Sequence, residues 1–257
     1  PPAEALRTAD GRPVEVVFHL AGEPVAEGRW TPDKRRRIMD SRRLGTRHLV
    51  DAIGAMPSGE RPRVLVSASA VGFYGPRGDE TLDENTAPGR DFLSEVCSAW
   101  EAEAMRAEAL GLRVATARIG IVLGEGGGAL DRMQKIFRLG LGGRLGDGRQ
   151  WMPWIHVDDV VGLLLHAAKN EAVHGPFNVV APSPATNREF TEAFAAALHR
   201  PALLPVPAFA LRLAFGELAD VILASQRVVP RAAEQSGYRF RHPQLAAAIA
   251  DSLATAR

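Results

Sequence analysis

Cysteine is almost absent from this sequence of 257 residues, which contains only Cys97. With one thiol, no disulfide can form within the chain, and a cysteine-rich zinc site is excluded. Unpaired cysteine is typical of proteins in a reducing compartment, so we expect the protein in the cytoplasm.

An excess of one charge and long apolar runs are lacking as well. Lys and Arg number 31 against 30 Asp and Glu, and this formal net charge of +1 does not favour binding to a nucleic-acid backbone. No apolar run approaches the roughly 18 residues of a membrane span. We therefore expect a soluble monomer or homodimer that binds a small-molecule substrate, with neither nucleic acid nor a membrane as partner.

Short apolar runs alternate with helical stretches along much of the chain. The predicted strands are 14–20, 63–69, 113–123 and 177–180, and the main predicted helices are 32–53, 91–110, 157–168 and 187–198. This alternation predicts an α/β fold in which a parallel sheet carries helices on both faces. Ligands of such folds bind at the carboxyl ends of the strands, so the residues that follow each strand are the candidates for a site.

Several short motifs occur in a fixed order at these strand ends and on the helices between them. They are Leu20-Ala21-Gly22-Glu23-Pro24, Ser41-Arg42-x-x-Gly45-Thr46, Ser67-Ala68-Ser69-Ala70-Val71-Gly72-x-Tyr74-Gly75, Trp100-Glu101, Arg118-x-Gly120-x-Val122-Leu123-Gly124, Gly127-Gly128-Ala129-Leu130, Trp154-Ile155-His156-x-Asp158-Asp159 and Ala181-Pro182. Together they resemble the epimerase-like branch of the extended short-chain dehydrogenases/reductases, close relatives of the nucleotide-sugar epimerases. The resemblance runs from about Val14 to about Leu253.

This resemblance implies a Rossmann-like domain that binds NAD(P)(H) and a small C-terminal lobe that closes over a substrate. We expect residues 1–125 to form the cofactor domain without its first βα units. Residues 126–257 are expected to form mostly the substrate lobe, with about 150–182 returning to the sheet. The glycine-rich stretch from Gly126 to Trp154 is predicted to be a flexible flap over the substrate site. The rings of Trp151 and Trp154 either offer flat apolar faces to a substrate ring or pack at the hinge of this flap.

The resemblance also assigns a cofactor site. A strand that ends in small residues lets a flat cofactor lie against the main chain, and an arginine fork suits a phosphate, which favours NADP(H) over NAD(H). Without the resemblance, Leu20 and Ala21 would be read as core and Arg42 as a solvated helix charge. The expected cofactor-binding residues are Leu20, Ala21, Gly22, Arg42, Ser67 and Val122.

The glycine-rich turn that holds the pyrophosphate in dinucleotide-binding folds is not found before Val14. We expect it in a segment that precedes Pro1 in the gene product, because a Rossmann sheet without its central strand would leave apolar edges bare. The run Gly124-x-Gly126-x-x-Ala129 has the form of this turn. The resemblance, however, places that run on the substrate side.

The usual catalytic pair of the family, a Tyr with a Lys four residues later, is missing. The chain has two tyrosines, Tyr74 and Tyr238, and the fourth residue after them is Gly78 and His242. No lysine is therefore placed to lower the pKa of a phenol. On the helix that should carry the pair, the equivalent positions are near Glu95 and Ala99.

Catalysis is expected to rest on Ser69, Tyr74 and Glu101. Ser69 stands at a strand end where the family has its catalytic hydroxyl, Tyr74 can offer a proton, and Glu101 or Glu95 can act as base. Together with these residues, the resemblance implies an oxidoreductase or epimerase that acts on a polar, sugar- or nucleotide-linked substrate. The alternative is a non-catalytic module that binds or senses the nicotinamide cofactor, which the missing Tyr/Lys pair favours.

One further group of residues has the chemistry of metal ligands. His156, Asp158 and Asp159 stand within four positions. We expect them instead to cap the helix that begins there, and we expect no metal.

Overall fold

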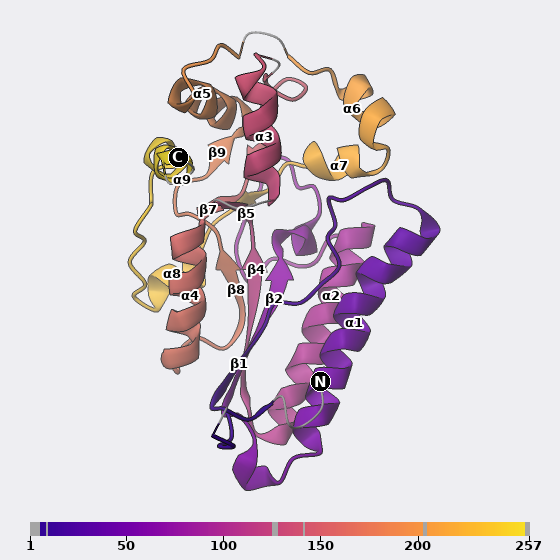
Figure 1. The fold of residues 1–257 in the computed structure, drawn as a ribbon, viewed down its shortest axis with the longest axis vertical. Coiled ribbons are helices and arrows are strands. Elements are labelled where there is room, and N and C mark those ends of the chain that lie inside the picture. Colours follow the sequence, from indigo (N-terminus) through magenta and orange to yellow (C-terminus); the bar gives the residue numbers. More distant parts are fainter. Residues whose placement is uncertain (1–5, 9, 125–127, 141, 203–204, 255–257) are drawn as a thin grey trace.

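Four parallel strands form the central sheet of the computed structural model, which describes residues 6–8, 10–124, 128–140, 142–202 and 205–254 (Figure 1). The strand order is β1 (Val16–His19), β2 (Val64–Ala70), β4 (Arg113–Ile119) and β8 (Gly175–Val179). All three pairings are parallel. The valine-rich runs therefore form the buried strands that the sequence predicts.

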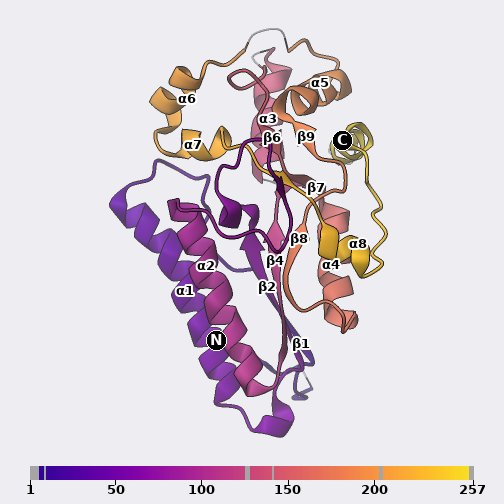
Figure 2. The ribbon, with the colours of Figure 1, turned by 180° about the vertical axis from the view of Figure 1, so that it is seen from behind.

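Helices cover both faces of this sheet (Figures 1 and 2). Because successive strand residues point to opposite faces, Leu65 packs against α1 (Pro32–Gly54) and α2 (Phe92–Met105), whereas Val64 packs against α4 (Val157–Lys169). The predicted α/β sheet is confirmed. No helix among these described residues has the length and apolar character that crossing a bilayer requires.

The predicted strand 113–123 is two strands, separated at Gly120. β5 (Ile121–Leu123) leaves the central sheet and pairs with β7 (Trp154–His156). Any side chain at Gly120 would lie 2.5 Å from the carbonyl oxygen of Pro153, so glycine is required where the chain turns out of the sheet. A continuous apolar run does not reveal this change of partner.

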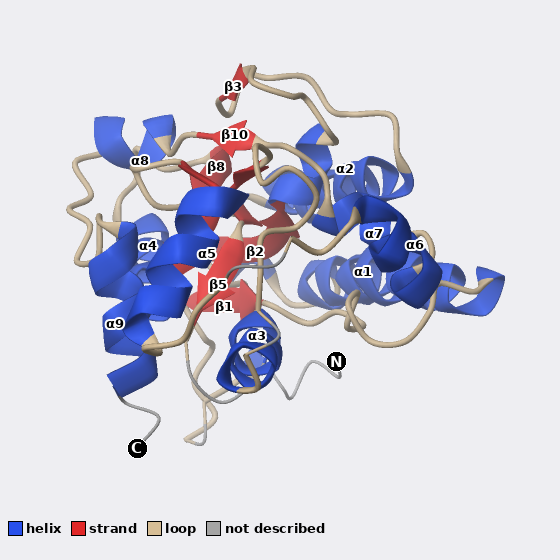
Figure 3. Cartoon of the chain, turned by 90° about the horizontal axis from the view of Figure 1, so that it is seen from above, coloured by secondary structure: helices blue, strands red, loops and turns tan. Residues whose placement is uncertain are grey.

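Beyond β5 the chain builds a second layer of helices, seen from above in Figure 3. The helices of this lobe pack through apolar side chains: Phe190 and Phe194 of α5 (Asn187–Ala197) contact Trp154 and Ile249 of α9 (Leu245–Ala254). α6 and α7 lie on the side of α1 (Figures 1 and 3), and Arg35 of α1 pairs with Glu217 over 2.8 Å. The helices of the lobe are α3 (Gly128–Arg138), α5 (Asn187–Ala197), α6 (Ala208–Phe215), α7 (Leu218–Ile222) and α9 (Leu245–Ala254).

Short elements that the sequence did not predict complete the fold. β3 (Thr81–Leu82) pairs with β10 (Arg227–Val228), and β6 (Trp151–Met152) pairs with β9 (Ala185–Thr186). The remaining helices are α8 (Arg231–Gln235) and the 3-10 helices Ser58–Glu60, Val71–Tyr74 and Arg106–Leu110. Strands of two residues carry too little periodicity to be recognised in a sequence.

β1 is an edge strand with apolar side chains on its surface. It pairs only with β2 among the described strands, and Phe18 and Leu20 are 40% and 53% exposed. The carboxyl end of this strand is therefore open, which matters for the site described below.

The C-terminal tail is held on α4 by a buried carboxylate. Asp159, which is 1% exposed, accepts hydrogen bonds from the main-chain N–H groups of Arg241 and His242 and from the hydroxyl of Tyr238. The ring of Tyr238 crosses α4 at Gly162, where a Cβ would collide with the hydroxyl and lie 3.1 Å from Cζ. Glycine at this position lets the tail approach the helix.

We predict that Gly162→Ala lowers the free energy of unfolding by about 1–3 kcal/mol, the usual cost of overpacking. Because the hydroxyl is the nearest atom, the same change should cost less in a Tyr238→Phe background. Urea unfolding of the two single variants and the double variant measures this coupling. Gly45→Ala is the matched control, since Gly45 lies in α1 with no neighbour within 4 Å and alanine there should be neutral or stabilising. Equal stability of Gly162→Ala and Gly45→Ala would contradict the prediction.

Candidate functional site

The candidate site is centred on a buried ion pair at the carboxyl end of the sheet. Arg118, near the end of β4, places Nε 2.9 Å from Oε1 of Glu101 and Nη2 2.9 Å from Oε2. Ser69 faces Arg118 in the register of β2 and β4 and donates its hydroxyl to Oε1 of Glu101 over 2.6 Å. The side chains of Arg118 and Glu101 are only 4% and 11% exposed. The structure thus brings together two of the predicted catalytic residues, Ser69 and Glu101.

Tyr74, the third predicted catalytic residue, lies beneath this pair. Its hydroxyl donates to Oδ1 of Asn178 over 2.7 Å and accepts from Nη1 of Arg118 over 3.0 Å. The residue is 0% exposed, and burial raises the pKa of the phenol to about 12, although Arg118 opposes the shift. Tyr74 is therefore a neutral, fully enclosed side chain whose hydroxyl is already bonded on both sides.

Two residues that the sequence analysis missed hold this network. Asn178 of β8 also donates its side-chain amide to the carbonyl of Val229, and Glu84 accepts from the main-chain N–H groups of Asn178 and Ala232. A polar residue inside the apolar run 177–180 is a usable signal for Asn178, because a buried amide needs partners. Glu84 lies in a polar loop, and no sequence pattern marks it.

An exposed ledge follows β1 beside this network. Leu20, Ala21 and Gly22 are all exposed, and the register of His19 with Ser67 places them at the carboxyl end of β2. Small residues leave the main chain accessible, so a flat ring system can lie against it. The ledge therefore fits the nucleotide that the sequence predicts there.

Arg42 borders the ledge and braces it from below. Its Nη1 donates to the carbonyl oxygens of Glu23 and Ile38 over 3.0 and 3.2 Å, and its guanidinium lies 4.9 Å from the ring centre of Trp100. Burial lowers the pKa of this guanidinium. Arg42 is thus half-buried and bonded to the main chain, unlike the solvated helix charge that its sequence context alone suggests.

The other predicted site residues have different environments. Ser67 is 0% exposed and its hydroxyl donates to the carbonyl of Ala68, so its side chain presents no surface to a ligand. Val122 lies half-buried in β5 and pairs with Ile155. Glu95 is exposed on α2, apart from the Arg118 network that contains Glu101. Of the two carboxylates considered as a base, only Glu101 lies in the network.

The predictions for the region between β5 and α4 have mixed outcomes. His156 caps α4 as expected, because its Nδ1 accepts from the N–H of Asp158 over 3.2 Å. The expectation that Trp154 faces a substrate is wrong: the residue is 1% exposed and its indole donates to the carbonyl of Ser183, since it packs in the core of the lobe.

Trp151 is half-buried, and its indole N–H donates to the carboxylate of Asp79. Residues 125–127, in the middle of the run Gly124-x-Gly126-x-x-Ala129, lie outside the described residues.

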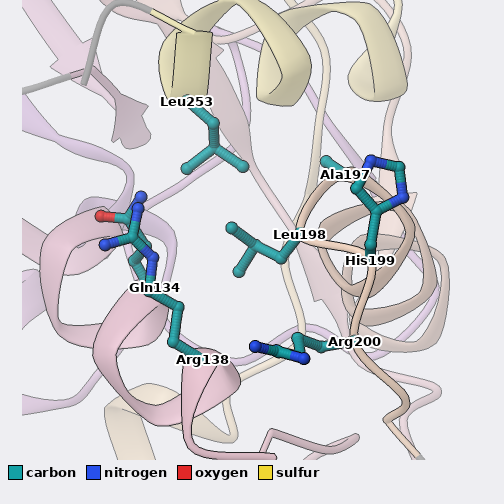
Figure 4. Close-up of a pocket in the computed structure, with 7 residues that line it drawn as sticks. All are labelled: Gln134, Arg138, Ala197, Leu198, His199, Arg200 and Leu253. Carbon is teal, nitrogen blue, oxygen red and sulfur yellow. The ribbon is translucent and has the colours of Figure 1, made fainter. Parts of the chain in front are cut away.

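A pocket of about 300 Å³ lies elsewhere, in the lobe between the ends of α3, α5 and α9 (Figure 4). Its basic residues Arg138, His199 and Arg200 stand at or just after helix C-termini, where cations offset the negative end of the helix dipole. The helix ends account for these charges, so the pocket does not need an anionic ligand to explain them. It takes no part in the site described above.

Comparison with known proteins identifies two family matches. Residues 3–198 match the NAD dependent epimerase/dehydratase family, and residues 206–252 match a domain of unknown function, DUF1731. The first match contains Ser69, Tyr74, Glu101 and Arg118, and the second contains Val229 and Ala232, whose main chain bonds Asn178 and Glu84.

Individual relatives agree with this match. The chain is 44% identical over 226 residues to the chloroplastic SDR39U1 homolog of the epimerase family from Arabidopsis thaliana, covering 88% of this chain and 65% of that protein. The human epimerase family protein SDR39U1, solved with NADPH, superposes with a TM-score of 0.84 at 36% identity, covering 93% of this chain and 81% of that one. A nucleoside-diphosphate sugar epimerase from Corynebacterium glutamicum gives a TM-score of 0.77 at 36% identity, covering 98% of this chain and 48% of that one. The chain thus spans between 48% and 81% of the length of these three proteins.

We predict that neither tyrosine ionises near pH 10 in the folded protein. Burial raises the pKa of Tyr74 to about 12, and burial together with the Asp159 carboxylate raises the pKa of Tyr238. A spectrophotometric titration of tyrosinate should show a midpoint near about 10 only after the protein is unfolded in urea. Tyr238→Phe leaves Tyr74 as the sole phenol, so the same titration of this variant reports Tyr74 alone. A midpoint near 10 in the folded variant would show that Tyr74 is accessible to solvent.

Proposed function

The chain belongs to the NAD dependent epimerase/dehydratase family, and from this we propose that it binds NADP(H) and acts as an oxidoreductase or epimerase. The proposed substrate is a polar small molecule, sugar- or nucleotide-linked. The observation that carries the proposal is the Ser69–Glu101–Arg118 network beside the exposed ledge after β1. We further propose that the protein works in the cytoplasm as a monomer or homodimer, in keeping with its single cysteine.

The proposed cofactor site uses the ledge of Leu20, Ala21 and Gly22, with Val122 on the neighbouring β5. When bound there, the nicotinamide supplies hydride acceptance or donation. Arg42 stands at the rim of the ledge with the fork geometry that suits a phosphate, which supports NADP(H) over NAD(H). The human relative solved with NADPH is consistent with this choice.

The direction of the Ser69 hydrogen bond indicates how a proton would move. Because Ser69 donates to Glu101, its oxygen can accept a hydrogen bond from a substrate hydroxyl once a substrate reaches this side chain, which is 3% exposed in the structure. In the oxidative direction, the substrate O–H proton passes to Ser69, and the Ser69 proton passes to Glu101, while the carbon gives up hydride. In the reductive direction, Ser69 gives its proton to the carbonyl oxygen and takes one from protonated Glu101, while the carbon receives hydride. Arg118 holds the Glu101 carboxylate in place throughout.

Tyr74 fits a positioning role better than direct contact with the substrate carbonyl. Its hydroxyl is enclosed and links Arg118 to Asn178, so it fixes the guanidinium that holds Glu101. Direct binding of the carbonyl by Tyr74 stays a prediction, and it would require the side chain to leave this enclosure.

A non-catalytic module is the second candidate function. The observation that favours it is the lack of a lysine four residues after either tyrosine. Such a module would bind the cofactor at the same ledge without turnover.

We predict hydride transfer by the protein on a panel of sugar nucleotides and small carbonyl compounds, followed as the absorbance of NADPH. Ser69→Ala should lower kcat by about 10²–10⁴-fold, the usual contribution of a positioned proton-transfer group. Glu101→Gln should lower it at least as far, and Tyr74→Phe less. Glu95→Gln is the matched control on the same helix and should be as active as the parent. Turnover unaffected by all three changes would place the site elsewhere, whereas NADPH binding with no turnover on any substrate would favour the module.

We also predict that Arg42→Ala weakens NADPH binding by about tenfold more than NADH binding, which corresponds to about 1.4 kcal/mol. The reason is loss of a fork directed at the 2′-phosphate. Fluorescence titrations with both cofactors measure the two losses. If Arg42 only braces the main chain of Glu23 and Ile38, both affinities will fall by the same factor, and the NADP(H) preference must be sought in another residue.

A further inference from the structure

A second group of chemically active side chains lies outside the Ser69–Glu101–Arg118 network, at the start of α4. His156, His242 and Asp251 each offer a ligand atom, and these atoms all lie within 4.8 Å of one another. They come from three parts of the chain: the junction of β7 with α4, the turn before α9, and α9 itself. Because His156 is far from His242 and Asp251 in the sequence, only folding brings the three residues together.

Packing of the tail fixes the group. The buried carboxylate of Asp159 binds the main-chain N–H of His242, which places the ring of His242 3.8 Å from the ring of His156, measured between centres. Nε2 of His156 then lies 3.3 Å from Oδ2 of Asp251. Two imidazoles and one carboxylate thus meet where the tail contacts the core.

We propose that His156, His242 and Asp251 form a binding site for a divalent transition-metal ion of the zinc type. Imidazole nitrogen and carboxylate oxygen are common ligands of zinc, and sites with three protein ligands leave a fourth position for water. The side chain of Asp251 is 54% exposed, so solvent and an ion can reach the group, while His156 is buried behind it. The carboxylates of Asp158 and Asp159 add negative charge around an incoming cation.

Binding requires both rings to rotate, because they lie nearly face to face with an angle of 31° between their planes, and Nε2 of His242 lies 3.5 Å from Oδ2 of Asp158. The hydrogen bonds of His156 change as well. In the structure its Nδ1 accepts from the N–H of Asp158, so the proton of the neutral ring resides on Nε2 and points at Asp251. When the ion binds, Nε2 loses its proton and Nδ1 gains one, leaving the ring neutral. The Asp158 carboxylate lies 4.0 Å from Nδ1 and can accept that new N–H, as carboxylates commonly do behind a metal-bound histidine. As the ring rotates, Nδ1 moves away from the main-chain N–H of Asp158, which is left to bond water.

An ion at this site would join the tail to the lobe and the core at one point. His156 ends β7, which pairs with β5, and Asp251 belongs to α9, which packs against α5. Anything that binds the folded but not the unfolded chain raises stability with its concentration. We therefore expect a bound ion to raise the stability of the fold and to take no part in hydride transfer.

The test is titration of the untagged protein with zinc chloride by calorimetry, together with thermal unfolding at increasing zinc. We expect one ion per chain and a midpoint temperature that rises with zinc concentration. Asp251→Asn and His242→Gln should each weaken zinc binding at least tenfold and reduce the rise, without loss of the native fold by circular dichroism. These two positions are chosen because His156→Ala would also remove the cap of α4. His174→Gln, an exposed histidine elsewhere, is the matched control and should bind like the parent.

Three outcomes would overturn the proposal. The parent protein takes up no zinc; or both variants bind zinc as tightly as the parent; or His174→Gln loses binding to the same extent, which would assign the uptake to scattered surface histidines. None of these measurements depends on catalytic activity at Ser69. A failure to bind zinc would therefore leave the proposed function untouched, and a lack of hydride transfer would leave the zinc site untouched.

Discussion

The pairing of Arg118 with Glu101 is the constraint on which the rest of the site depends. It joins β4 to α2 under the end of the sheet, where little water reaches either charge. Two charges in such a place are tolerated only when each finds its partner and its remaining hydrogen bonds. Ser69 and Tyr74 supply those bonds, and the face of Phe73 lies 3.5 Å from the guanidinium. The polar side chains of the site are therefore ordered by the need to compensate one buried cation.

The same constraint distinguishes this network from the Tyr/Lys pair, which the sequence lacks. In the usual arrangement a lysine ammonium acts on a phenol that faces the substrate. Here the cation is a guanidinium, the phenol of Tyr74 is enclosed, and the hydroxyl of Ser69, which is only 3% exposed, is bonded to Glu101. The cation acts on a carboxylate instead. The fold, by contrast, is that of the family.

Sequence reasoning reached the sheet, its helices and two members of the network, because these depend on local patterns. The valine-rich runs around Leu65 and Val114 predict buried strands, and Ser69 stands at a strand end, where sites of this fold lie. The point at which the chain leaves the sheet, Gly120, was not predictable. Only glycine fits there because the main chain of Pro153, 33 residues further on, approaches it closely. Asn178 and Glu84 were missed for the same reason: their importance arises from partners distant in the sequence. The enclosure of Tyr74 is likewise a property of packing and not of its motif.

The open edge of β1 has a consequence for how other strands can pair with it. Strand edges that present unpaired main-chain groups are templates for pairing with other chains, and apolar side chains increase the tendency. Phe18 and Leu20 lie on this edge, and the nearby charges of Lys34 and Arg37 are held by Glu23 on the loop that follows, not on the strand itself. Any strand that pairs with this edge would therefore satisfy the main-chain groups of β1 and cover Phe18 and Leu20 at the same time.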